Sequence, residues 1–172
     1  FDRVNPEALI HLVAQTDLYE AEAHPEHDFD VNVLPAVYAC ENCARLGTRV
    51  VFASTVTVQG LTNRSSPPFP EAVLCKPVSV YDTHKLMSEE FIQSKGVTHS
   101  ILRLANVYGP SQGASKAGRG VVNQFVRKGL AGETLQVYDS VKDCVRDFVF
   151  IEDVCEAFLR VLASKRNSVY NV

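Results

Sequence analysis

Tyr81 and Lys85 are the residues best suited to acid–base chemistry, and they stand four positions apart. On a helix this spacing places both side chains on one face, so an ammonium can approach the phenol and favour its ionised form. A free tyrosine has a pKa of about 10, and a nearby cation makes the phenol a usable base near neutral pH. The pair suggests proton abstraction from a hydroxyl group. The same spacing also occurs by chance on solvent-exposed helices, so neighbouring elements must decide between the two interpretations.

Ser54 and Thr55 supply hydroxyl groups at the end of an apolar run, residues 49–54, that predicts a buried strand. The carboxyl ends of parallel strands form the edge at which open sheets bind their ligands. A hydroxyl group at that edge can hydrogen-bond a reacting oxygen. The helix that carries Tyr81 and Lys85 is predicted from about 80 to 94, after a proline-rich loop at 61–78. Glu89 and Glu90 are interpreted as part of the polar face of this helix.

The elements around these residues alternate between strand and helix. Apolar runs predict strands at 8–14 and 99–104 as well as at 49–54, and helical spacing between Pro25 and Gly47 predicts a helix kinked at Pro35. This alternation is typical of right-handed crossovers and a parallel sheet. Beyond Pro110 the pattern predicts a loop at 111–120, a helix near 121–131, strands near 135–138 and 147–151, a helix over 154–162 and a strand from 168.

The composition narrows the class of protein. The chain has 172 residues, is 46% hydrophobic and carries a formal net charge of −3, which is typical of one globular domain or a domain and a fraction. The absence of a Lys/Arg cluster argues against nucleic acid or an anionic membrane as a partner. No apolar run reaches the ~18 residues that a membrane helix needs, and no secretory signal pattern is present. We therefore expect a cytoplasmic protein.

The cysteines and histidines predict no metal site. There are five cysteines, an odd number that suits a reducing compartment. Cys40 and Cys43 resemble half of a zinc motif, but they lie in an apolar helical stripe, so we expect them to pack in the core.

Four segments, taken in order, resemble the extended short-chain dehydrogenase/reductase family, the NAD-dependent nucleotide-sugar epimerases and dehydratases. They are residues 10–15, 52–60 with 81–85, 102–110 and 146–154. The resemblance implies an α/β fold, with a partial Rossmann-like, doubly wound parallel sheet and part of a smaller α/β substrate-binding region. Residues 1–109 would be the C-terminal half of the cofactor domain, with its strands 4–6. Residues 110–172 would belong to the substrate-binding region, with elements that return to the main sheet.

The resemblance also assigns roles. Tyr81 would take a proton from a sugar hydroxyl, Lys85 would hold the nicotinamide ribose and lower the pKa of the tyrosine, and Thr55 would orient the sugar oxygen. Ala14 and Ser54 would lie beside the cofactor, which is NAD or NADP, with NAD favoured. The residues expected to face the nucleotide-sugar substrate are Asn106, Arg146 and Asn32.

The sequence departs from the family pattern at several positions. No Gly-x-x-Gly-x-x-Gly turn occurs in the 172 residues, so the chain resembles an internal segment of a longer protein, and we expect the segment alone to be inactive. Val56 and Thr57 stand where 4,6-dehydratases carry an acid and a base. His84 stands where many members have serine.

The function implied is nucleotide-sugar epimerisation, most simply at carbon 4, by transient oxidation to a keto-sugar. The alternatives are a 4,6-dehydratase or reductase of the same family, or a non-catalytic cofactor-binding or scaffold relative. Family members commonly form homodimers through the helices that correspond to 25–46 and 80–94, and we expect the same here.

Overall fold

A computed structural model of the chain describes residues 1–60, 69–110, 112, 120–137, 145–164 and 166–172. The main sheet contains four strands, in the order β1-β2-β3-β6, and each pair in it is parallel. Its strands are β1 (Ala8–His11), β2 (Arg49–Thr55), β3 (His99–Leu104) and β6 (Ser168–Asn171). The parallel sheet and the α/β class expected from the sequence are thus confirmed.

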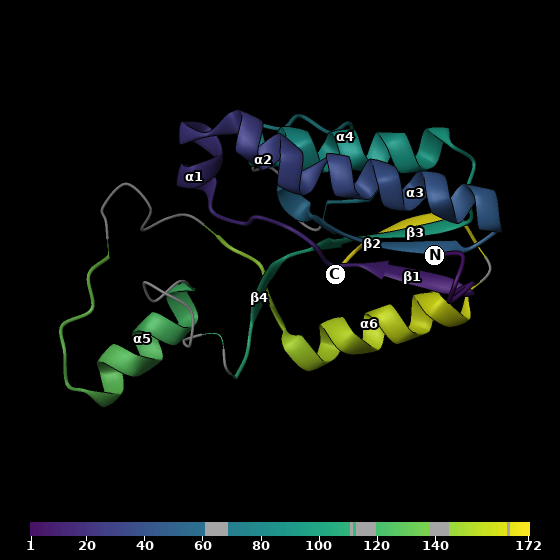
Figure 1. Ribbon diagram of the computed structural model, residues 1–172. Helices are drawn as coiled ribbons and strands as arrows, with labels where there is room; N and C mark the ends of the chain where they lie inside the picture. Colours follow the sequence, from purple (N-terminus) through teal and green to yellow (C-terminus); the bar gives the residue numbers. More distant parts are fainter. Residues whose placement is uncertain (61–68, 111, 113–119, 138–144, 165) are drawn as a thin grey trace.

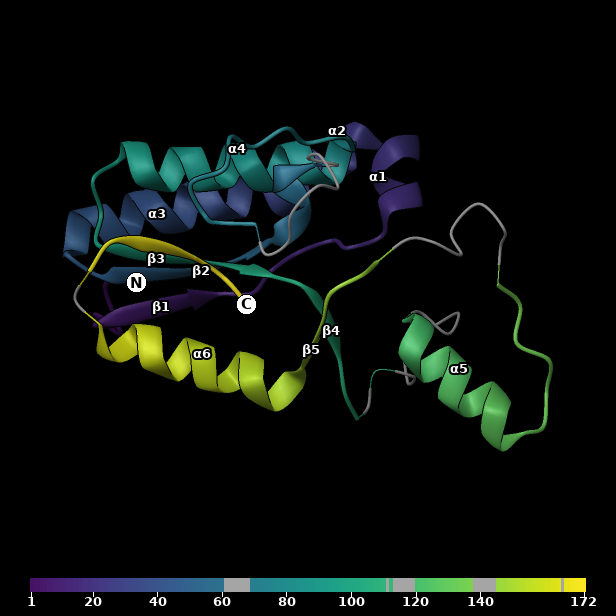
Figure 2. The same cartoon turned by 180° about the vertical axis from the view of Figure 1, so that it is seen from behind.

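Helices cover both faces of this sheet (Figures 1 and 2). On one face lie α1 (Leu18–Ala23), α2 (Pro25–Asn32), α3 (Leu34–Leu46) and α4 (Val80–Ser94), and on the other lies α6 (Ile151–Ala163). Each interface has its own hydrophobic cluster. Cys40 and Cys43 pack with Phe52 and Ile92 on the first face, and Val154 and Phe158 belong to the second cluster. The core position expected of the two cysteines is confirmed.

A second, two-stranded sheet extends beyond the carboxyl edge of the main sheet. Its strands β4 (Asn106–Tyr108) and β5 (Phe148–Phe150) run parallel. Helix α5 (Val121–Leu130) stands apart from the layered body in both views. A short 3₁₀ helix, η1 (Val56–Gln59), follows β2 directly.

The strand β6 is fixed to the main sheet by side chains as well as by backbone pairing. Arg49 at the start of β2 is 8% exposed, and its Nη2 donates to Ser100 Oγ at 2.7 Å and to the Arg166 carbonyl oxygen at 2.9 Å. The Asn167 side chain accepts from the His99 amide at 2.9 Å. These contacts join the amino ends of β2 and β3 to the segment just before β6.

The element boundaries differ from the sequence predictions in informative places. Helix α4 and strand β3 have the predicted limits, whereas β1 already ends at His11. The kink expected at Pro35 is a complete break after Asn32: Pro35 lies in the first turn of α3, where a missing amide hydrogen costs nothing. The strand predicted near 135–138 is wrong, because 135–137 are irregular, and 138 lies outside the described residues. Helix α1, strand β4 and η1 were not predicted.

Candidate active site

The candidate site begins where β2 and β3 end. Thr55 is the last residue of β2 and pairs in register with Leu104 of β3, so Asn106 follows at the same edge. Strand β1 ends at His11, level with Phe52, and the chain then continues through Ala14 towards α1. The topology therefore brings the predicted hydroxyl, amide and cofactor-side residues to one edge of the sheet, as the sequence pattern indicated.

Two hydrogen bonds to α4 hold the end of β2 on either side of Thr55. Ser54 Oγ donates to the Glu89 carboxylate, and Thr57 Oγ1 donates to the Asp82 carboxylate. Ser54, Asp82 and Glu89 are all buried. Because both bonds reach a single helix, the position of Thr55 relative to α4 is fixed from two sides.

These bonds also set the direction of the Thr55 hydroxyl. Its Oγ1 lies 2.8 Å from Thr57 Oγ1 and accepts from the Thr57 amide at 3.3 Å. A carboxylate can only accept, so the single hydroxyl hydrogen of Thr57 points to Asp82 and the Thr55 hydroxyl must donate to Thr57. The remaining lone pair of Thr55 Oγ1 is thus available to accept a hydrogen bond from a hydroxyl ligand.

Glu89 is a buried anchor rather than a surface residue, and the sequence interpretation of it was wrong. It is 0% exposed and receives Arg103 of β3 in a two-pronged ion pair, with Nη2 to Oε2 at 2.7 Å and Nε to both oxygens at 3.1 Å. Burial opposes the charge of Arg103, but hydrogen bonding and the charge of Glu89 outweigh it and raise the pKa of Arg103. The neighbouring Glu90 is exposed, as expected.

Lys85 lies in the interior between α4 and β2. It is 2% exposed, and its Nζ lies 4.2 Å from the centroid of the Phe52 ring, a cation–π contact. Burial lowers the pKa of Lys85 to about 8, although Glu89 and Asp28 act in the opposite direction. The ammonium therefore loses its proton more easily than that of an exposed lysine.

Tyr81 lies in the first turn of α4 and is partly buried. Burial, followed by the charges of Asp82 and Asp28, raises its pKa to about 12. The sequence spacing predicted the opposite direction, because it considered the ammonium of Lys85 and neither the burial of the phenol, which is the largest cause, nor the charges of Asp82 and Asp28. In the chain as it stands, Tyr81 keeps its proton at neutral pH.

Asn106 and Arg146 are brought together by the small sheet. The backbone amide and Nδ2 of Asn106 both donate to the Asp147 carbonyl oxygen, at 3.1 Å and 2.8 Å. Arg146 directly precedes this residue, and both Asn106 and Arg146 are exposed. Their contact with a substrate diphosphate stays a prediction, which the shared location favours.

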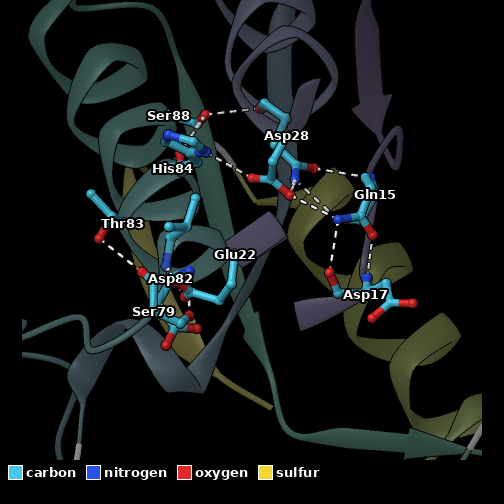
Figure 3. A network of polar contacts seen from close by, with 11 residues as sticks. Gln15, Asp17, Glu22, Asp28, Ser79, Asp82, Thr83, His84 and Ser88 are labelled. Carbon is cyan, nitrogen blue, oxygen red and sulfur yellow. Dashed lines mark hydrogen bonds and ion pairs between the residues drawn. The ribbon is translucent and has the colours of Figure 1, made fainter. Parts of the chain in front are cut away.

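Asn32 is placed differently from the other candidates. It is 0% exposed, its Oδ1 accepts from the Gln15 amide at 3.1 Å, and its Nδ2 donates to the Gln15 carbonyl oxygen and to Asp28 Oδ1. These bonds fix the segment that follows Ala14 (Figure 3). The substrate contact expected of Asn32 stays a prediction, but the burial of the side chain and the use of both amide hydrogens within the chain argue against it.

The part of this edge that would meet a nicotinamide cofactor has suitable chemistry. A dinucleotide presents ribose hydroxyls and a nicotinamide ring, which need hydrogen-bonding and cationic partners together with flat packing surfaces. Lys85 offers an ammonium, Tyr81 a phenol, and Ala14 a small side chain beside the strand end. Ser54, in contrast, donates its only hydroxyl hydrogen to Glu89. Among the described residues, no group of His, Cys, Asp and Glu side chains could hold a metal ion.

Comparison with known proteins identifies close relatives. The model of the NAD dependent epimerase/dehydratase family matches residues 1–172. The chain is 32% identical over 172 residues to a putative UDP-glucose 4-epimerase of Methanocaldococcus jannaschii, covering 96% of this chain and 55% of that protein. It is 30% identical over 176 residues to the GDP-6-deoxy-D-mannose reductase of Pseudomonas aeruginosa, covering 97% and 57%.

A solved structure shows the same arrangement of elements. The UDP-glucose 4-epimerase of Thermus thermophilus, in complex with NAD, is similar to this chain with a TM-score of 0.86 and 32% identity. The match covers 100% of this chain and 58% of the Thermus chain. The chain thus spans about half the length of the relatives it matches. No helix in the described ranges is long and apolar enough to cross a membrane.

Proposed function

The chain belongs to the NAD-dependent epimerase/dehydratase family, and on that premise we propose that the whole protein is a nucleotide-sugar 4-epimerase that uses NAD. The observation that carries the proposal is that Thr55 ends β2 and is flanked by Ser54 and Thr57, which hydrogen-bond to α4, the helix that carries Tyr81 and Lys85. The 4-epimerases among the relatives, at 32% identity, support the choice of reaction.

The chain's own residues would hold and move one proton. Tyr81 takes the proton of the reacting sugar hydroxyl and later returns it, Thr55 orients the sugar by accepting a hydrogen bond from another of its hydroxyl groups, and Lys85 binds hydroxyl groups of the cofactor ribose. A bound oxidised nicotinamide would supply positive charge and the reversible two-electron oxidation at the sugar carbon. Because Tyr81 has a pKa of about 12 in this structure, added positive charge is what would make it a usable base. Asn106 and Arg146 would hold the diphosphate.

The test is an assay of the whole protein for interconversion of UDP-glucose and UDP-galactose. We expect Tyr81→Phe to lower the rate by orders of magnitude while nucleotide-sugar binding, measured by calorimetry, is retained. Tyr19→Phe is the matched control, since Tyr19 is 89% exposed. Unchanged turnover in Tyr81→Phe would exclude the proposed role.

A reductase is the second candidate, favoured by the 30% identity to the GDP-6-deoxy-D-mannose reductase. The two reactions differ in stoichiometry. A reductase consumes one reduced cofactor for each product, whereas an epimerase shows no net consumption. Accumulated keto-sugar without consumption would instead indicate a dehydratase.

We also propose that the protein is a cytoplasmic homodimer in which residues 25–46, which form α2 and α3, and α4 of two subunits pack together. Tyr38 of α3 and Met87 of α4 are 61% and 40% exposed, which leaves large side chains available on these helices. Sedimentation of the wild type and of Met87→Glu tests this arrangement: a shift of the variant to the monomer supports it, and a wild-type monomer contradicts it.

A further inference from the structure

The Thr55 hydroxyl lies at the end of a chain of hydrogen-bonding side chains that begins at a buried carboxylate. Asp82 of α4 is 4% exposed and accepts from Thr57 Oγ1. Thr57 Oγ1 in turn lies 2.8 Å from Thr55 Oγ1. Thr57 is exposed and Thr55 is half-buried, so the chain leads from the interior of the protein to the open edge of the sheet.

The first turn of α4 holds Asp82 in place. Ser79 caps the helix, and its Oγ accepts from the Asp82 amide at 3.1 Å. Glu22 of α1 accepts from the Val80 amide at 2.9 Å, so a second helix also fixes this turn (Figure 3). The first turn of a helix favours negative charge, because its amide groups are unpaired. Asp82 is thus a well-placed acceptor beside the end of β2.

The carboxylate sets the direction of each hydrogen in the chain. Asp82 can only accept, so the single hydroxyl hydrogen of Thr57 points to Asp82 and that of Thr55 points to Thr57. The Thr57 amide donates to Thr55 Oγ1 at 3.3 Å and occupies one of the two lone pairs of that oxygen. Thr55 therefore has no hydrogen left to donate and one lone pair left to accept with.

The neighbouring hydroxyl group has the same polarity. Ser54 Oγ donates to Glu89, the second buried carboxylate of α4. Both hydroxyl hydrogens at the end of β2 are thus committed towards α4, directly for Ser54 and through Thr57 for Thr55. A hydroxyl group outside such a chain can rotate to suit either a donor or an acceptor, whereas these two cannot.

We propose that Asp82 and Thr57 are positioning residues that make Thr55 an acceptor-only contact, so that a ligand must present a hydrogen-bond donor to it. The identity of the ligand rests on the proposed function: it is a nucleotide sugar, and the donor is a sugar hydroxyl other than the reacting one. A carbonyl, ether or fluorine substituent at the same carbon offers only lone pairs and would leave both sides unpaired. The site therefore selects sugars that are hydroxylated at the contacted carbon.

The selectivity is tested with ligands that differ in one hydroxyl group. The whole protein is titrated calorimetrically with UDP-glucose and with analogues in which fluorine replaces the hydroxyl at carbon 2, 3 or 6. We expect at least one analogue to bind the wild type about tenfold or more weakly than UDP-glucose. In Thr57→Val the hydrogen of Thr55 is released and can point to the fluorine, so the ratio of the two affinities should fall towards one. The analogue whose ratio falls identifies the contacted carbon.

Three further variants make the ratio specific to the chain of hydrogen bonds. Thr57→Ser keeps the hydroxyl group and should keep the wild-type ratio, and Thr98→Val, at an exposed threonine, is the matched control. Asp82→Ala frees the Thr57 hydrogen and should lower the ratio as Thr57→Val does. A general weakening of the fold reduces both affinities and leaves their ratio unchanged. Equal ratios in the wild type and Thr57→Val for every analogue overturn the proposal.

Neutron diffraction tests the polarity without a sugar. In crystals of the whole protein, deuterium should lie on Thr57 Oγ1 towards Asp82 and on Thr55 Oγ1 towards Thr57. A deuterium on the Asp82 carboxyl group, or a Thr57 deuterium that points to Thr55, overturns the proposal. A protein that neither binds nor converts UDP-glucose would contradict the proposed function, while the deuterium positions would still decide the polarity of Thr55.

Discussion

At the scale of single residues, burial shifts the pKa values of the two central side chains of the candidate site in opposite directions. Lys85 is a cation that burial disfavours, and Tyr81 is an acid that burial and two carboxylates keep protonated. Both shifts act against a phenolate–ammonium pair in the chain as it stands. In the proposed reaction, a bound ligand would therefore have to change the electrostatics before proton transfer begins.

The buried ammonium of Lys85 makes the stability of the chain depend on pH. Its pKa is about 8 in the fold against an ordinary 10.5, so between these values the unfolded chain binds more protons and stability rises with pH. The whole shift corresponds to about 3 kcal/mol. We expect the free energy of unfolding in urea to rise in the wild type relative to Lys85→Met as the pH increases from 8 to 10.

The comparison with Lys85→Met is needed because buried thiols lower the free energy of unfolding over the same pH range. Burial raises the pKa of Cys43 to about 11, and a thiol whose folded pKa is raised loses stability as the pH passes its unfolded value. Cys43 is present in both chains, so its contribution cancels. A constant difference between wild type and variant across this range would contradict the prediction.

At the scale of elements, α4 is the part that assembles the site, because it is tied to β2 and β3 by its own side chains. Glu89 binds Ser54 at the end of β2 and Arg103 of β3, and Asp82 binds η1 directly after β2. Removing one partner of a buried ion pair costs more than the pair itself contributes, because a charge is left behind.

We expect Glu89→Gln to lower the free energy of unfolding by roughly 3 kcal/mol or more. The matched control is Glu90→Gln, whose exposed side chain should change it by less than about 0.5 kcal/mol. Denaturant titration of the two variants measures both values. Equal effects would show that Arg103 finds another partner.

The turn after η1 requires glycine at position 60. Gly60 has φ of +71°, and a Cβ there would lie 2.0 Å from the Lys76 carbonyl oxygen. Gly47 has φ of +70° with nothing within 4 Å of such a Cβ. We expect Gly47→Ala to cost about 1 kcal/mol from backbone strain alone and Gly60→Ala to cost clearly more, because the backbone of Lys76 must move. Thermal unfolding of both variants compares them, and similar melting temperatures would contradict the expectation.

At the scale of the whole molecule, the sequence predicted the layered parallel sheet but not the contacts between its layers. Strand and helix periodicity is local, so it located Thr55 at the end of β2 and Lys85 on α4 correctly. The pair of Asp28 and His84 joins residues 56 positions apart, and no local pattern specifies such a partner. For the same reason, the sequence pattern placed both Glu89 and Glu90 on the polar face of α4, although Glu89 is buried and paired with Arg103.

The same layering predicts how the molecule opens. Cys40 and Cys43 are both 0% exposed between α3 and the sheet, and Cys155 on α6 is exposed. We expect a thiol reagent to label Cys155 at once and to label the two core cysteines only as fast as the layer opens. Mass spectrometry of the labelled peptides gives the three rates. Labelling of Cys40 or Cys43 at the rate of Cys155 would show that α3 leaves the sheet without cooperative unfolding.

The attachment of β6 bears on how the protein is made. Arg49 reaches the Arg166 carbonyl across 117 residues, and β6 pairs with β3 rather than with a strand close in sequence. Translation delivers residues at about 5–20 per second, so β2 and β3 leave the ribosome seconds before their last partner. During that interval the nascent sheet has an open edge at β3 and an arginine without its carbonyl acceptor. Protection of that edge during synthesis is thus part of the cost of this topology.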